Sequence, residues 1–311
     1  MTIRLGRRRF IQISAATGAL SLVPGPWAAF GMTTGDDVIR RRIPATGEAI
    51  PVAGMGTYRT FDIDVGNPQT RERMLQVLRR FVDGGGRVID SSPMYGRAES
   101  AVGELAGELG VTDTLWMATK VWTRGQDSGV DQMEQSLERM GVATMDLMQV
   151  HNLLDFETHL ATLKAWKDEG RVRYIGATHY VASRHDDLAR LIEKYPLDFL
   201  QFNYNVTERN AEQRLLPACA DNGVATLINE PFEQGRLFSR VKGRALPDWA
   251  GEIGASSWAQ LFLKFLIGHP AVTAVIPATS DPEHAAENVA AGRGVVPDEA
   301  IRKRIRQAVE A

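Results

Sequence analysis

The sequence has little cysteine, almost no net charge and no long apolar run. Cys219 is the single cysteine among 311 residues, which excludes an intrachain disulfide and a zinc site made of several cysteines. The 36 Lys plus Arg nearly balance the 38 Asp plus Glu, so nothing favours nucleic acid or an anionic membrane as the main partner. We therefore expect a globular protein with a small-molecule partner, no bound metal and no stable membrane insertion.

Residues 1–31 differ in composition from the rest of the chain. A basic segment, RRRFIQ at 7–12, precedes a mildly apolar stretch rich in Ala and Gly. A Pro-Gly-Pro triplet that begins at Pro24 interrupts this stretch before about 20 apolar residues accumulate, so a membrane span is not expected. The segment resembles a twin-arginine signal peptide with Arg7 and Arg8 as the pair, although no clean A-x-A cleavage site follows. A disordered basic arm is the alternative interpretation.

Strand-like and helix-like segments alternate along residues 40–311. Strands are expected at 52–56, 87–90, 115–120, 145–151, 172–177, 198–203, 223–228 and 272–276. Amphipathic stretches such as 71–85, 130–141, 159–170 and 258–269 lie between them, and several end in Gly, as helix C-termini tend to. This alternation predicts an α/β fold: a (β/α)8 TIM barrel with an N-terminal hairpin, a long loop at 230–255 and a C-terminal helix at 298–311.

A doubly wound open sheet is the alternative fold. It requires a G-x-G-x-x-G turn after the first strand, and GMGTYR at 54–59 supplies only two of those glycines. We therefore favour one barrel domain at 40–311, preceded by the signal segment at 1–31.

Polar residues end three of the expected strands. Asp90 ends the second strand, Lys120 the third and His151 the fourth, and Tyr95 follows in the loop after Asp90. Each alone is typical of a solvated strand end, but the C-terminal strand ends of a barrel meet at one face. A Lys ammonium beside Tyr95 would lower its pKa from about 10, Asp90 would orient the lysine, and His151 would bind a carbonyl oxygen. The group is suited to protonating an oxygen that becomes alkoxide as hydride arrives at carbon.

Several segments of the chain resemble motifs of the aldo-keto reductases. The most specific is IDSSPMYGRAESAVG at 89–103, which follows the family's D-[ST]-A-x-x-Y-G-x-[AS]-E-x-x-x-G block. The others are GMGT, ATK, MDLMQVH, GRVRYIGATHY, LQFNYN, EPFEQGRL and IPATSDPEHAAEN. The resemblance implies that Asp90, Tyr95, Lys120 and His151 form a catalytic tetrad, with Tyr95 the general acid in reduction and the general base in oxidation.

The resemblance also implies an extended nicotinamide cofactor, with NADP(H) favoured over NAD(H). Thr178, His179 and Gln201 match the positions that hold the carboxamide. The other matched positions would line the cofactor: Gly56, Thr57, Asp90, Pro231, Phe232, Gly235, Leu237, Thr279, Glu287 and Asn288. Asp281 is expected to cap a helix there, with Pro282 in its first turn.

Several positions depart from the family pattern. Thr178 and His179 replace the family's Ser-Asn after the fifth strand. Asn229 stands where many members place an aromatic ring against the nicotinamide, and Glu230 replaces a serine. Ala278 and His284 stand where members that prefer NADPH often have Lys and Arg around the adenosine 2′-phosphate. The proton-transfer residues are therefore complete, and the cofactor-holding residues are altered.

Side chains on the expected strand-end loops are candidates for a substrate wall: Tyr58, Met94, Trp122 and Asn152, and further Phe156, Phe232 and Trp249. Arg97 and Arg124 are candidates for binding a substrate carboxylate. The expected substrate is a small carbonyl compound or alcohol, and the expected activity is NAD(P)H-dependent reduction of aldehydes or ketones, or the reverse. The alternatives are an exported nicotinamide-binding sensor or partner-binding protein with little turnover, and a barrel lyase or isomerase without redox chemistry.

The twin-arginine resemblance implies a location and a partner. A functional signal predicts export of the folded protein to the periplasm by the Tat machinery, and a non-functional one predicts a cytoplasmic protein.

Overall fold

The computed structural model describes residues 38–311, and the expected signal segment at 1–31 lies outside them. Eight strands form one parallel sheet in chain order: β3 (Met55–Gly56), β4 (Val88–Asp90), β5 (Trp116–Val121), β6 (Met145–His151), β7 (Val172–His179), β8 (Phe199–Asn203), β9 (Ala225–Asn229) and β10 (Ala274–Val275). Backbone hydrogen bonds from Gly54 to Val275 (2.8 Å) and from Gly56 to Pro277 (3.0 Å) join the first strand to the last. The sheet is therefore a closed barrel, and the predicted fold is confirmed.

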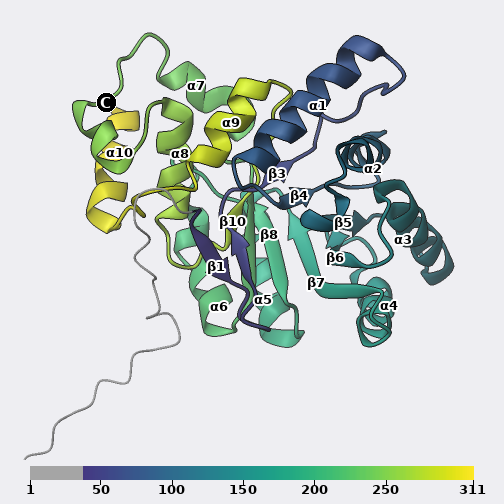
Figure 1. The fold of residues 1–311 in the computed structure, drawn as a ribbon. Coiled ribbons are helices and arrows are strands. Elements are labelled where there is room, and N and C mark those ends of the chain that lie inside the picture. The colour runs from purple at the N-terminus through teal and green to yellow at the C-terminus, as the bar shows by residue number, and fades with distance from the viewer. Residues whose placement is uncertain (1–37) are drawn as a thin grey trace, which may run out of the picture. The chain divides into compact units, whose positions relative to one another are not determined.

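Helices follow the strands and cover the outside of the barrel (Figure 1). They are α1 (Pro68–Asp83), α2 (Ala98–Leu109), α3 (Gln126–Met140), α4 (Phe156–Asp168), α5 (His185–Lys194), α6 (Leu215–Asp221), α7 (Arg236–Arg240), α8 (Trp258–Ile267), α9 (Pro282–Ala290) and α10 (Glu299–Glu310). Asp281 caps α9 as predicted, since its side chain accepts hydrogen bonds from the N–H groups of Glu283 and His284. Among residues 38–311, no helix combines the length and apolar character that crossing a membrane requires.

The segment at 230–255, expected as a long loop, contains short helical elements. They are η4 (Glu233–Gly235), α7 and η5 (Asp248–Ile253). Their few residues and irregular apolar spacing give no helical periodicity, so the sequence pattern does not indicate them.

The expected hairpin consists of β1 (Arg40–Arg42) and β2 (Ala49–Pro51), which pair antiparallel. Its Ile43 and Ile50 are buried in the same cluster as the barrel interior, whose other members are Val88, Trp116, Ala118, Leu147, Tyr174, Phe199, Ala225, Leu227, Ala274 and Ile276. The interior residues recur at every second position, as side chains on one face of a strand must. Six inward-facing positions nearer the C-terminal strand ends are polar, namely Asp90, Lys120, Gln149, Thr178, Gln201 and Asn229. Strand periodicity thus creates a polar layer above the apolar interior.

Candidate active site

Lys120 and Asp90 form a buried ion pair at the centre of the polar layer. Lys120 Nζ lies 2.6 Å from Asp90 Oδ2, and their side chains are 0% and 3% exposed. The ammonium also donates to the carbonyl oxygen of Ser91. Burial opposes the charge on Lys120, but Asp90 and Tyr95 outweigh it and raise the pKa of Lys120 above its usual value. The lysine is therefore a fixed positive charge inside the barrel.

The other carboxylate oxygen of Asp90 is held by two amides from neighbouring strands. Gln149 Nε2 donates to Asp90 Oδ1 at 3.1 Å, and Gln201 Nε2 donates to the same oxygen at 2.8 Å. The oxygen of Gln201 in turn accepts from Thr178 Oγ1 at 3.2 Å and from Asn229 Nδ2 at 3.3 Å. Hydrogen bonds to the ionised carboxylate compensate for its burial, so the ion pair has a fixed geometry.

Tyr95 lies beside this ion pair, with Lys120 Nζ 5.0 Å from the centre of its ring. Burial raises the pKa of Tyr95, and Lys120 lowers it by a smaller amount, so its pKa remains above the usual value. Lys120 lowers the pKa of Tyr95 as expected, but burial of the phenol and the negative charge of Asp90 outweigh it, so the net shift in the free protein is upward. Tyr95 is therefore a protonated phenol, suited to donating a proton.

His151 completes the group as a neutral ring. Its ring centre lies 6.0 Å from that of Tyr95 with the planes at 85°, and Ser92 Oγ lies 3.0 Å from Nδ1. Burial, with smaller effects of Lys120 and His179, lowers the pKa of His151 to about 2. The ring therefore acts as a hydrogen-bonding group rather than as a cation.

A cavity of about 730 Å³ opens directly above these residues. Its wall includes Asp90, Tyr95, His151, Thr178 and Gln201, together with four predicted substrate residues, Tyr58, Met94, Trp122 and Asn152, and five further predicted cofactor residues, Gly56, Thr57, Pro231, Phe232 and Gly235. Residues predicted from seven strands and the loops that follow them thus line one cavity.

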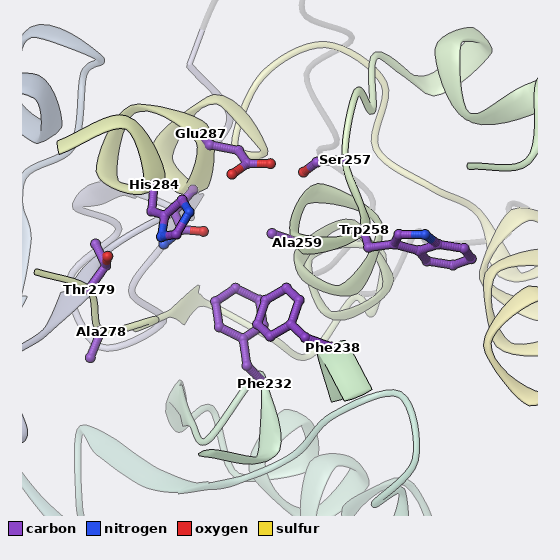
Figure 2. Close-up of a pocket in the computed structure, with 10 residues that line it drawn as sticks. Phe232, Phe238, Ser257, Trp258, Ala259, Ala278, Thr279, His284 and Glu287 are labelled. Atoms are coloured by element: carbon purple, nitrogen blue, oxygen red, sulfur yellow. The ribbon is translucent and has the colours of Figure 1, made fainter. Parts of the chain in front are cut away.

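A second cavity of about 330 Å³ lies between α8, α9 and α7, and it shares Phe232, Phe238 and Ala278 with the first. Figure 2 shows the two phenylalanine rings on one side of this pocket and Glu287 and Ser257 on the other. Predicted cofactor residues Thr279, Glu287 and Asn288 line it. The two cavities adjoin at these three shared residues, and together they are called the cleft below; the arrangement suits an extended ligand.

Several predicted residues do not line either cavity. Leu237 is fully buried, and His179 Nδ1 accepts a hydrogen bond from the N–H of Val181 while its ring stacks on Tyr180. Phe156 packs against Tyr195, and the guanidinium of Arg304 covers Trp249 at 4.5 Å.

The predicted carboxylate-binding arginines are also outside the wall. Arg97 is exposed, and its guanidinium nitrogens lie 3.8 Å from carboxylate oxygens of Asp62 and Asp64. Arg124 lines neither cavity. Arg59 is the only Lys or Arg in the wall of the larger cavity.

The sequence pattern did not indicate Gln149, Ser92, Arg59 or Tyr180 as site residues. Gln149 could have been found, because it lies two residues before His151 and so faces the same side of the strand. Arg59 and Tyr180 lie on loops, where no periodicity indicates direction.

Backbone strain is concentrated at the cleft. In residues 38–311, seven residues other than glycine have positive φ, and Arg59, Asn152, Glu230 and Gln234 among them line the larger cavity. Such conformations are unfavourable for side chains with Cβ and tend to persist at functional sites.

The fold and the site together define a barrel enzyme whose reactive groups lie at the C-terminal strand ends. Residues 53–310 match the Aldo/keto reductase family. The chain therefore belongs to this family of oxidoreductases, as the sequence motifs predict.

Curated relatives are similar at moderate identity. The chain is 28% identical to aldo-keto reductase YhdN of Bacillus subtilis (strain 168), over 64% of this chain and 63% of the relative. It is 26% identical to methylglyoxal reductase YeaE of Escherichia coli (strain K12), over 78% of this chain and 85% of the relative. It is 28% identical to the NADH-specific methylglyoxal reductase of the same organism, over 53% and 58%. The match thus spans slightly less than two thirds of the first relative and of the third.

A solved structure shares the fold. An aldo-keto reductase from Klebsiella pneumoniae in complex with NADPH superposes with a TM-score of 0.71 at 24% identity, covering 88% of this chain and 95% of that one.

Proposed function

We propose that this protein is an NAD(P)H-dependent carbonyl reductase, which converts aldehydes or ketones to alcohols or catalyses the reverse reaction. The observation that supports this most strongly is the position of Tyr95 beside the buried Lys120–Asp90 ion pair, at the base of the large cavity. A protonated phenol next to a fixed ammonium is suited to giving a proton to an oxygen that gains negative charge.

The residues of the cleft fit a nicotinamide cofactor. The amide of Gln201 is fully used by the side chains around it, but Asn229 Oδ1 on the wall is buried without a hydrogen-bond partner. An unpaired buried carbonyl oxygen is unfavourable, and the N–H of a nicotinamide carboxamide would pair with it. Asn229 would then take the contact expected of His179, whose ring is held against Tyr180.

When bound, the nicotinamide supplies the hydride that reaches the carbonyl carbon. Tyr95 donates its phenolic proton to the carbonyl oxygen, and the charge of Lys120 stabilises the phenolate that remains. Ser92 donates to His151 Nδ1 in this scheme, which leaves the Nε2 hydrogen to hold the carbonyl oxygen. In oxidation the same groups act in the reverse order.

The family resemblance favours NADP(H) over NAD(H), and the Klebsiella pneumoniae structure contains NADPH. One curated relative is named as NADH-specific, so the family includes both preferences. The preference of this chain depends on the charges at the adenosine end of the cleft.

A substrate panel tests the proposed function. Purified protein is mixed with NADH or NADPH and a series of aldehydes and ketones, including methylglyoxal, and the absorbance of the reduced nicotinamide is followed. We expect consumption of the cofactor that requires both protein and carbonyl compound. Tight cofactor binding without turnover of any carbonyl would instead support a nicotinamide-binding sensor.

We also propose that residues 1–31 direct export to the periplasm through the Tat machinery. The support is the sequence alone, with Arg7 and Arg8 ahead of the apolar stretch. Fusion of the segment to a reporter tests this, with the double substitution Arg7→Lys and Arg8→Lys as comparison. Periplasmic reporter that disappears in the double variant is expected, and a cytoplasmic reporter in both would overturn the proposal.

A further inference from the structure

The smaller cavity has an unusual charge for a site that would hold the adenosine end of a dinucleotide. Ten of the described residues, 38–311, line it, and none of these ten is Lys or Arg. Glu287 is the one Asp or Glu among them, and it lies on the same side of the pocket as Ser257, opposite the two phenylalanine rings (Figure 2). His284 is the only other lining residue with a titratable side chain. A phosphate monoester in this pocket would therefore face a carboxylate and no fixed cation.

The N-terminus of α9, which borders the pocket, is already occupied by a carboxylate. Asp281 Oδ1 accepts hydrogen bonds from the N–H of Glu283 at 2.8 Å and from the N–H of His284 at 3.2 Å. These backbone hydrogen bonds hold the pKa of Asp281 below its usual value, so the cap is ionised. A helix N-terminus would otherwise attract a phosphate, but here its donors are used and its partial charge is offset.

Nearby arginines are engaged by other carboxylates. Arg80 on α1 donates to Glu283 Oε1 at 3.1 Å, and Arg236 Nε lies 3.3 Å from Glu233 Oε1. Lys264 on α8 points into the protein, where its ammonium donates to the carbonyl oxygens of Arg293 and Val295. Arg244, whose guanidinium lies 5.4 Å from the ring centre of the lining residue Trp258, donates to the carbonyl oxygens of Val309 and Ala308. These four cations therefore have hydrogen-bond or ion-pair partners outside the pocket wall.

The same pocket offers suitable partners for ribose hydroxyl groups. A carboxylate that accepts from the ribose 2′-hydroxyl is a recurrent means of binding NAD(H), and Glu287 supplies one. Ser257 and Thr279 add hydroxyl groups on either side of it. With the ribose beside it, Glu287 would favour a free 2′-hydroxyl over a 2′-phosphate.

We propose that this chain selects NAD(H) over NADP(H) through the anionic adenosine end of its cleft, formed by Glu287 and the Asp281 cap with Ala278 and His284 in place of cations. This inference rests on the proposed function, since it concerns the cofactor of the same site. The negative 2′-phosphate meets like charge without a counterion, and the 2′-hydroxyl meets an acceptor.

Equilibrium binding to the cofactor-free protein tests the proposal without any turnover. Dissociation constants for NADH and NADPH are measured by calorimetry at one pH and one salt concentration. We expect NADH to bind about tenfold or more tightly than NADPH, as unbalanced like charge predicts. Tighter binding of NADPH would overturn this inference alone, whereas failure of both dinucleotides to bind would overturn the proposed function as well.

Variants of the pocket extend the test. The double substitution Ala278→Lys and His284→Arg should reverse the preference by strengthening NADPH binding about tenfold or more, since it adds two cations where the phosphate would lie. Asp281→Ser keeps a capping oxygen and removes the charge, so it should strengthen NADPH binding and leave NADH binding nearly unchanged. Asp298→Ser makes the same change at the N-cap of α10, outside both cavity walls, and should alter neither. Equal effects of the two serine variants would contradict the proposal.

Discussion

The carboxylate of Asp90, at the end of β4, connects that strand to three others. It accepts hydrogen bonds from Lys120 on β5, Gln149 on β6 and Gln201 on β8. Each partner is an inward-facing residue near the C-terminal end of its strand. A buried carboxylate with this many donors is stable only while all of them remain. The geometry under Tyr95 therefore depends on residues that do not themselves contact a substrate.

Removal of either member of the ion pair should destabilise the fold. Lys120→Met or Asp90→Leu leaves an uncompensated buried charge, and we expect a loss of about 3–5 kcal/mol in the free energy of unfolding for each. The double variant should recover a large part of that loss because no buried charge remains. Urea unfolding of the two single variants and the double variant measures these free energies of unfolding. If the loss in the double variant equalled the sum of the two single losses, Lys120 and Asp90 would not be coupled.

The neutral state of His151 predicts a pH dependence of stability. The unfolded chain takes up a proton on this histidine below roughly pH 6.5, and the folded protein does so only near pH 2, since burial holds the pKa of His151 at about 2. The stability from the neutral ring is thus present above pH 6.5 and is lost as the pH falls. We expect His151→Gln to reduce the slope of unfolding free energy with pH by about 1.4 kcal/mol per unit. Identical slopes for His151→Gln and the unsubstituted protein between these pH values would contradict the burial of a neutral ring.

Two glycines of α2 differ in what surrounds them. A Cβ on Gly103 would lie 2.1 Å from the carbonyl oxygen of Arg139 on α3, whereas a Cβ on Gly107 would meet no atom within 4 Å. Gly103→Ala should therefore force α2 and α3 apart and lower the free energy of unfolding by about 1–3 kcal/mol. Gly107→Ala should raise it by about 0.5–1 kcal/mol, because alanine favours helix. Thermal and urea unfolding of the two variants measure the change in the free energy of unfolding for each. Equal changes for Gly103→Ala and Gly107→Ala would show that α2 and α3 are not in close contact at Gly103.

At the level of elements, strand periodicity predicted most of the fold. The eight strands lie within a few residues of their expected positions, because buried strands and amphipathic helices leave different apolar patterns. The helices inside 230–255 could not be predicted, since elements of a few residues contain too little pattern. Loop residues such as Arg59 and Tyr180 were missed for a related reason, because their direction is set by tertiary packing.

The candidate site was predictable where it lies on strands. Asp90, Lys120 and His151 end strands of a barrel, so their convergence follows from topology. The net pKa of Tyr95 could not be predicted, because it depends on the balance between burial and the charge of Lys120, and burial is known only from the packed structure. The turn of His179 away from the cleft likewise depends on its stacking with Tyr180.

For the molecule as a whole, the cleft links stability to ligand binding. Its wall draws on loops from both halves of the barrel, including the segment around Gln234 and the start of α9. A dinucleotide that binds only the folded protein should stabilise it by about 2.7 kcal/mol at a hundred times its dissociation constant. Thermal unfolding with rising NADH should therefore show a continuous increase in Tm, and a Tm independent of NADH would indicate that the cleft does not bind it.

The central claim is that Tyr95 is the proton donor of a carbonyl reductase. The most direct measurement compares Tyr95→Phe with Tyr180→Phe, a matched change at another tyrosine of the same cavity wall. For Tyr95→Phe we predict a fall in kcat of about two or more orders of magnitude, the scale of general acid catalysis, with the dissociation constant for reduced cofactor nearly unchanged. Tyr180→Phe should retain most of its turnover. A Tyr95→Phe protein that reduces its carbonyl substrate at the rate of the unsubstituted enzyme would contradict the account.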